Sequence, residues 1–131
     1  MTAPKIQVII SLAVNTPDRA QAVAAAADSL CNLFTRVRVS PIEITAPLSG
    51  HGANYANAVA VAETTLPPEA VVVALKCLEA NAGRQRLNRN DIPLDLDLLD
   101  YDGQELPALR LPRKSQLSLD FNRRALAELS R

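Results

Sequence analysis

Hydrophobic and polar residues alternate along four stretches of the chain, and hydrophobic residues recur at helical spacing along two others. Alternation predicts strands, and the helical spacing predicts helices. The expected strands are residues 5–14, 35–45, 55–64 and 94–98, and the expected helices are residues 17–34 and 68–82. The order strand, helix, strand, strand, helix, strand predicts an α+β fold of the ferredoxin-like βαββαβ type, with two helices on one face of an antiparallel sheet.

Residues that start and stop helices support these boundaries. Thr16 is expected to cap the first helix and Pro17 to occupy its first position, and this helix is expected to end near Phe34. The second helix is expected to begin at Pro68 and to stop at Gly83.

The strand at residues 55–64 carries a row of small residues on one side: Ala56, Ala58, Ala60 and Ala62. Such a row lets packed helices approach the sheet closely. The same alternation puts Tyr55 and Asn57 on the opposite face, which we expect to be free for a ligand. The preceding strand contains Pro41 and is expected to be interrupted or bulged at an edge of the sheet.

Composition limits the classes of protein to consider. A chain of 131 residues, 48% of them hydrophobic, suits a single domain spanning residues 1–131. The 14 basic and 14 acidic residues cancel, which argues against nucleic acid or a membrane as partner. The N-terminal sequence lacks the features of a signal peptide, so we expect a cytoplasmic protein. Cys31 and Cys77 lack metal-binding spacing and are expected to be reduced and packed within the two helices.

Acidic residues alternate with leucines in the fourth expected strand. If Leu94, Leu96 and Leu98 face the helices, Asp95 and Asp97 lie on the open face, about 7 Å apart. Like charges at this separation repel, so a compensating partner is expected. One interpretation is a solvated edge with arginine partners. The other is a Mg²⁺ site, because Mg²⁺ binds one or two carboxylates and keeps water and substrate phosphate as its other ligands.

The loop before this strand is basic. It contains Arg84, Arg86 and Arg89, the kind of donors that a polyphosphate needs. Arginines and aspartates around one sheet face favour phosphate chemistry and the metal interpretation. Beyond the strand, a turn is expected at Asp102 and Gly103, followed by a short last helix within residues 120–131.

At this point the chain resembles the 6-hydroxymethyl-7,8-dihydropterin pyrophosphokinases, enzymes of folate biosynthesis that transfer diphosphate from ATP to a pterin alcohol. The resemblance covers most of the chain through ordered segments: "NTPDRAQAVAAAADSL", which keeps the family's asparagine as Asn15, "ITAPLSG", "NYANAVAVAETTLPPEAVVVALKCLEANAGRQR", "PLDLDLLDYDG" and a weakened "LPRKSQLSLDFNRRALAEL". The fold that it implies agrees with the predicted order of elements.

The resemblance also implies roles for the matching residues. Asp95 and Asp97 match the aspartates that bind two Mg²⁺ ions together with ATP. The positions that bind the pterin substrate match Thr45, Leu48, Tyr55 and Asn57. The positions that contact the nucleotide match Glu79, Arg84 and Arg123. Arg84, Arg86 and Arg89 are the candidates for basic catalytic groups that assist the transfer.

Several family features differ in this chain. The segment between Arg86 and Asp95 contains no tryptophan to cover the pterin, and the position of a nucleotide-binding histidine is Arg113. The position of the second stacking aromatic matches Ala125, and the sequence ends at Arg131, before the family's C-terminal extension. These differences leave the two metal-binding aspartates in place. They remove the two aromatic residues expected to hold the pterin between them, so we expect weaker pterin binding.

Three functions fit these observations. The first is Mg²⁺-dependent transfer of diphosphate from ATP to 6-hydroxymethyl-7,8-dihydropterin or a related small alcohol. The second is a catalytically decayed homologue that acts as a nucleotide-binding, pterin-binding or regulatory module. The third is a structural ferredoxin-like subunit without a ligand. An exposed edge on the fourth strand would also allow a homo-oligomer, which the sequence does not require.

Overall fold

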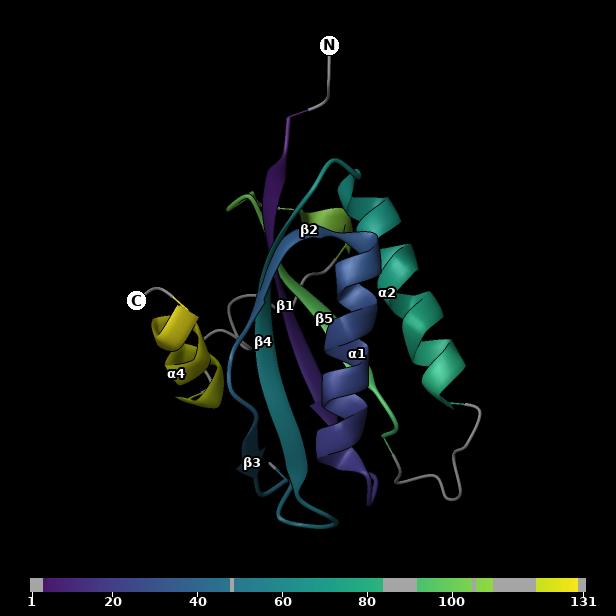
Figure 1. The fold of residues 1–131 in the computed structure, drawn as a ribbon, viewed down its shortest axis with the longest axis vertical. Helices are drawn as coiled ribbons and strands as arrows, with labels where there is room; N and C mark the ends of the chain where they lie inside the picture. Colours follow the sequence, from purple (N-terminus) through teal and green to yellow (C-terminus); the bar gives the residue numbers. More distant parts are fainter. Residues whose placement is uncertain (1–3, 48, 84–91, 105, 110–119, 130–131) are drawn as a thin grey trace.

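A five-stranded antiparallel sheet forms the centre of the molecule (Figure 1). The computed structural model describes residues 4–47, 49–83, 92–104, 106–109 and 120–129. The strands are β1 (Ile6–Val14), β2 (Thr35–Val39), β3 (Glu43–Thr45), β4 (Tyr55–Thr64) and β5 (Asp95–Tyr101). Their order is β2-β4-β1-β5, with β3 also paired to β4. This order and the antiparallel pairing confirm the predicted ferredoxin-like α+β fold.

The two helices of the predicted layer are α1 (Arg19–Leu33) and α2 (Pro68–Ala82), and both cover the same face of the sheet (Figure 1). Beneath them, β1 and β4 pair large residues with small ones. Leu12 lies opposite Ala58, and Ile10 lies opposite Ala60. The alanine row therefore leaves room for the helices, as predicted. The helix residues fully buried in this core are Val23, Leu30, Val71 and Leu75.

The start of α1 differs from the prediction. The helix begins at Arg19, and its N-cap is Asp18 rather than Thr16. The hydroxyl of Thr16 donates a hydrogen bond to Oδ1 of Asp18 at 2.7 Å, and Thr16 lies outside the helix, two residues before the N-cap. The start of α2 at Pro68 and its C-cap at Gly83 are confirmed.

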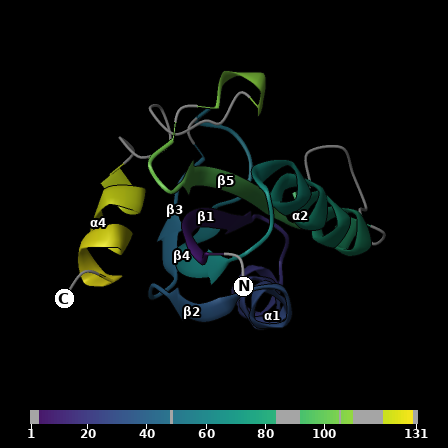
Figure 2. The ribbon, with the colours of Figure 1, turned by 90° about the horizontal axis from the view of Figure 1, so that it is seen from above.

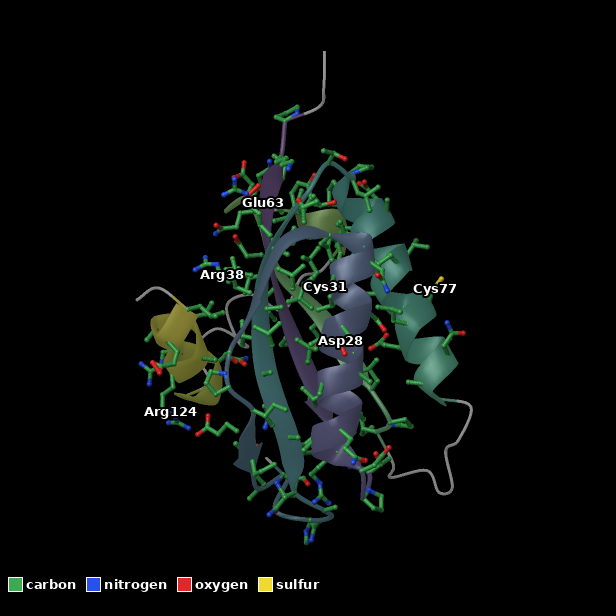
Figure 3. All side chains as sticks on the ribbon, in the orientation of Figure 1. Asp28, Cys31, Arg38, Glu63, Cys77 and Arg124 are labelled. Carbon is green, nitrogen blue, oxygen red and sulfur yellow. The ribbon has the colours of Figure 1, made fainter. Side chains whose placement is uncertain are left out.

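The prediction that both cysteines are packed was wrong, because Cys31 and Cys77 are exposed. The buried residues of α1 are Val23, Ala26 and Leu30, a stripe too narrow to include the next residue, Cys31. Figure 3 shows the Cys77 side chain on the outer side of α2.

The predicted interruption before β4 is confirmed, because β2 and β3 are separate strands on either side of Pro41. Ser40 bridges the interruption. Its N–H donates to the carbonyl of Val59, and its Oγ accepts from the N–H of Val59, both at 2.9 Å. Within β2, the register shifts between Thr35 and Arg38.

The last helix, α4 (Asp120–Leu129), lies on the sheet face opposite α1 and α2 (Figure 2). The expected helix is therefore present, but the expectation that this whole face is free was wrong. The contacts that attach α4 to the strands include a hydrogen bond and an ion pair. Nη1 of Arg38 donates to the carbonyl of Leu129 at 2.7 Å, and Arg124 forms an ion pair with Glu43. A 3₁₀ turn at Pro107–Leu109 is the remaining described element.

The predicted turn after β5 is present. Asp102 and Gly103 have φ angles of 53° and 69°, in the left-handed region that turn residues adopt. Oδ2 of Asp100 accepts a hydrogen bond from the N–H of Gly103 at 3.0 Å. Asp102 therefore belongs to the turn, and Asp100, near the end of β5, bonds to it through its side chain, as distinct from the acids at the start of the strand.

Candidate active site

The candidate site residues of β4 and β5 lie on one row across the sheet. Asn57 and Asp95 both pair with Ala13 of β1, one from each side. Since adjacent strands are about 4.8 Å apart, their Cα atoms are about 10 Å apart. Leu12 and Val14, which flank Ala13, lie in the core under the helices. The row therefore faces the other way, toward the side that carries α4.

The second aspartate lies on the next row of the same face. Asp97 pairs with Ser11, and Ser11 pairs with Val59 of β4. Leu96 and Leu98 are buried in the core under the helices. The predicted division of this strand is therefore confirmed, with leucines toward the helices and Asp95 and Asp97 away from them.

Asn57 is buried and its side chain is held by β3. Its Nδ2 donates to Oγ1 of Thr45 at 2.7 Å and to the carbonyl of Glu43 at 3.3 Å. Tyr55 is half-buried and pairs with Thr45 across the same two strands. The structure thus brings together three of the predicted pterin-binding residues: Thr45, Tyr55 and Asn57. The fourth, Leu48, lies outside the described residues.

A cavity of about 430 Å³ lies between α4 and strands β3 and β4. Asn57 lines it on the strand side and Ala125 on the helix side. Charged groups come from Glu43, Arg124 and Glu128. Within the described part of the chain, no aromatic side chain lines this cavity. It can hold a small molecule beside Asn57, with polar contacts in place of stacking.

Asp95 and Asp97 are both half-buried. Burial raises the pKa of Asp97, the negative charge of Asp95 raises it further, and Lys76 partly offsets both effects. Two partly desolvated carboxylates lie on one face, and a hard divalent cation bound to their oxygens would neutralise their negative charge. The pair therefore fits a Mg²⁺ ion that keeps water and phosphate oxygens as further ligands. Among the described residues, no group of three or more His, Cys, Asp or Glu side chains is placed to hold a metal.

Glu79 lies in the last turn of α2 and contacts β5 directly. Its Oε2 accepts a hydrogen bond from the N–H of Leu96, between the two aspartates, at 2.9 Å. Burial raises the pKa of Glu79, and hydrogen bonding and repulsion with Asp95 add to this, whereas the Leu96 N–H and Lys76 lower it. The nucleotide contact expected for Glu79 stays a prediction. Its bond to the strand backbone was not foreseen from the sequence.

Asn15 makes a second contact of this kind. Its N–H donates to the carbonyl of Ile92 at 3.1 Å, and its Oδ1 accepts from the N–H of Ile92 at 2.6 Å. The sequence marked Asn15 only as a residue shared with the resembled family. Its position directly after β1 was the one available signal, because β1 is the neighbour of β5.

The predicted basic residues are only partly placed. Arg84, Arg86 and Arg89 lie outside the described residues, so the basic loop stays a prediction. Arg123 is exposed on α4.

Of the helices that the structure describes, none combines the length and hydrophobicity needed to cross a membrane.

Two comparisons with known proteins agree with this arrangement. The family model described as 7,8-dihydro-6-hydroxymethylpterin-pyrophosphokinase matches residues 9–131. The chain is also 33% identical over 130 residues to 2-amino-4-hydroxy-6-hydroxymethyldihydropteridine pyrophosphokinase of Pseudomonas aeruginosa, an alignment that covers 95% of this chain and 80% of that protein. The matched span includes the strands that carry Asn57, Asp95 and Asp97. The chain therefore belongs to the 7,8-dihydro-6-hydroxymethylpterin-pyrophosphokinase family, which is a family of diphosphotransferase enzymes.

Proposed function

We propose that this chain transfers diphosphate from ATP to 6-hydroxymethyl-7,8-dihydropterin, as a step of folate biosynthesis. The observation that carries the proposal is the placement of Asn57 and Asp95 on one sheet face, on either side of Ala13. An acceptor beside Asn57 and a phosphate chain beside Asp95 would then lie within reach of each other. Family membership supports the same reaction class.

The acceptor is proposed to occupy the cavity beside Asn57. Its volume of about 430 Å³ is in the range of small-molecule sites. The hydrogen bonds to Thr45 and to the carbonyl of Glu43 fix the Asn57 amide, so its carbonyl oxygen has a set orientation for a donor on the ligand. Tyr55 and Leu48 are proposed to complete the acceptor site, as the family resemblance implies.

Asp95 and Asp97 are proposed to hold Mg²⁺, two ions in the form that the resemblance implies. When bound, the metal would neutralise the phosphate charge that otherwise repels an incoming hydroxyl oxygen. In the transfer, the acceptor oxygen forms a bond to the β-phosphorus of ATP. The bond from that phosphorus to the oxygen it shares with the α-phosphorus breaks, the proton of the acceptor hydroxyl is released, and AMP leaves.

The chain's own contribution is positioning and charge. Arg84, Arg86 and Arg89 are proposed to stabilise the transferring group, and Arg84, Arg123 and Glu79 to contact the nucleotide. Such a reaction needs little covalent chemistry from the protein, so alignment of the two substrates supplies most of the rate.

A second candidate is a binding or regulatory module without turnover. It is favoured by one observation, the absence of aromatic side chains from the described lining of the cavity, where Ala125 occupies the position matched to a stacking aromatic. Without aromatic side chains to stack on the pterin, the affinity for the acceptor would fall more than the affinity for the nucleotide.

The deciding experiment measures AMP formation by the purified protein with ATP, Mg²⁺ and 6-hydroxymethyl-7,8-dihydropterin, with Asp97→Ala as the inactive control. We expect one AMP for each diphosphorylated pterin. Calorimetry with a non-hydrolysable ATP analogue, run in parallel, separates the two candidates. Binding of the analogue without AMP release would favour the module, and a lack of binding would exclude the transferase and a nucleotide-binding module. A cytoplasmic location, the absence of a nucleic-acid partner and a homo-oligomeric state remain predictions.

A further inference from the structure

We propose that Asn15 and Glu79 are positioning residues that hold the Asp95–Asp97 segment in place from its two sides. This inference rests on the proposed function for its catalytic consequence, but its structural part can be tested separately. The observation behind it is that each side chain accepts a hydrogen bond from a backbone N–H close to the aspartates.

The strand that carries the aspartates needs such support. Among the strands that the structure describes, β5 lies at the edge of the sheet and pairs with β1 alone. An edge strand presents backbone groups without a strand partner, and repulsion between Asp95 and Asp97 disfavours their placement on one face. The pairing with β1 also shifts register between Ile9 and Ile10, toward the far end of the strand. The metal-binding end of β5 therefore depends on contacts other than a second strand.

Glu79 supplies the contact from the helix layer. Its carboxylate accepts from the N–H of Leu96, the residue between the two aspartates, and Leu96 itself is buried in the core. The bond fixes the peptide that joins Asp95 to Leu96. Because strand side chains alternate, fixing this peptide also fixes the directions of the flanking carboxylates.

Asn15 supplies the contact from the end of β1. Its backbone and side chain form two hydrogen bonds with Ile92, which precedes Asp95 by three residues. Because Ile92 both donates to and accepts from Asn15, the two bonds fix the orientation of the Ile92 backbone as well as its distance from β1. The two anchored residues, Ile92 and Leu96, lie on opposite sides of Asp95 in the sequence.

Both side chains bond to the backbone of this segment, and Glu79 also has a hydrogen bond with the side chain of Asp95. The Oε2 of Glu79 and the Oδ1 of Asn15 already accept main-chain donors. Partners that orient metal ligands typically change metal affinity 10- to 100-fold when they are removed. We expect a change of this order in Mg²⁺-dependent binding of an ATP analogue for Glu79→Ala, and a similar change for Asn15→Ala.

The test compares Glu79→Ala with Glu79→Gln, because glutamine keeps an acceptor oxygen for the Leu96 N–H and removes the charge. Amide hydrogen exchange at Leu96 is the structural readout. We expect roughly tenfold faster exchange in Glu79→Ala and near wild-type exchange in Glu79→Gln. Glu69→Ala, an exposed glutamate in the first turn of the same helix, is the matched control and should change neither the exchange of the Leu96 amide nor the binding of the analogue.

The outcomes separate this inference from the proposed function. Unchanged Leu96 exchange and analogue binding in Glu79→Ala would overturn the positioning role. A Glu79→Gln variant whose Leu96 amide exchanges as fast as in Glu79→Ala would also overturn it, since glutamine keeps an acceptor oxygen for that amide. If the wild-type protein released no AMP, the proposed function would fail, while the exchange and binding measurements would still decide the positioning role. For Asn15→Ala, the exchange of the Ile92 amide gives the corresponding readout.

Discussion

Asn57 of β4 and Asp95 of β5 both pair with Ala13 of β1, which lies between these two strands. The three residues face the side of the sheet opposite α1 and α2. This relationship joins the two parts of the candidate site. The cavity beside Asn57 lies toward β3 and α4, and the carboxylates lie on β5. A transfer reaction needs its acceptor and its phosphate donor side by side, and a row across three strands places the residues proposed to bind them on one face of the sheet.

The Asn57 amide is expected to be essential for acceptor binding and costly to remove. In Asn57→Ala, Thr45 and the carbonyl of Glu43 lose a partner in a partly buried place. We expect the free energy of unfolding to fall by about 1–3 kcal/mol and the KM for the pterin to rise at least tenfold. Thr45→Ser keeps the hydroxyl and serves as the control. An unchanged KM in Asn57→Ala would remove Asn57 from the acceptor site.

The Asp97 carboxyl is expected to destabilise the metal-free protein at neutral pH. Burial and Asp95 raise the pKa of Asp97 above its ordinary value of 3.8, so the folded state binds this proton more tightly than the unfolded chain. Stability from this group is complete below pH 3.8 and is lost as the pH rises through the folded pKa. Asp97→Asn should therefore raise the unfolding temperature at pH 7 without metal.

The size of this effect is expected to be about 1 kcal/mol or less, because Asp97 is only half-buried. Thermal unfolding of wild type and Asp97→Asn between pH 3.5 and about pH 7 measures it, and the difference between them should grow with pH. Addition of Mg²⁺ and an ATP analogue should stabilise wild type and not the variant. A variant less stable than wild type at pH 7 without metal would contradict the expectation.

An aromatic ring at position 125 is expected to strengthen acceptor binding. Ala125 lines the cavity opposite Asn57, and the described lining has no ring. A stacking contact contributes about 0.5–1.5 kcal/mol, so Ala125→Phe should tighten pterin binding by roughly 2- to 10-fold. Ala125→Leu adds volume without a ring and is the control. Equal gains from both variants would show that filled volume, rather than stacking, accounts for the change.

The core under the helices is expected to govern stability. Leu12 is fully buried and pairs with Ala58 on one side and Leu96 on the other. Leu12→Ala should lower the free energy of unfolding by about 2–5 kcal/mol, because it removes buried volume between two strands. Val73→Ala, at a side chain that is 60% exposed, should change it by less than about 0.5 kcal/mol. Chemical denaturation of both variants measures the contrast.

Sequence reasoning was reliable where the cause is local. The alternation of β4 and β5 predicted which side chains face the helices, and the structure confirms both divisions. Pro68 and the Asp102–Gly103 turn were also predicted, because proline and left-handed residues restrict the backbone within their own turn. Thr16 was wrong as the cap because the helix begins at Arg19, so that Asp18, two residues later, occupies the N-cap position.

By itself, the sequence determined the order of the elements, the ferredoxin-like topology and the shared face of Asp95 and Asp97, since hydrophobic periodicity acts over a few residues at a time. Only the tertiary structure decided what surrounds that face. The packing of α4 against β3 and β4, and the contacts of Asn15 with Ile92 and of Glu79 with Leu96, join residues distant in the chain. Such contacts depend on how whole elements pack, and no local pattern specifies which of several polar side chains will meet a given backbone group.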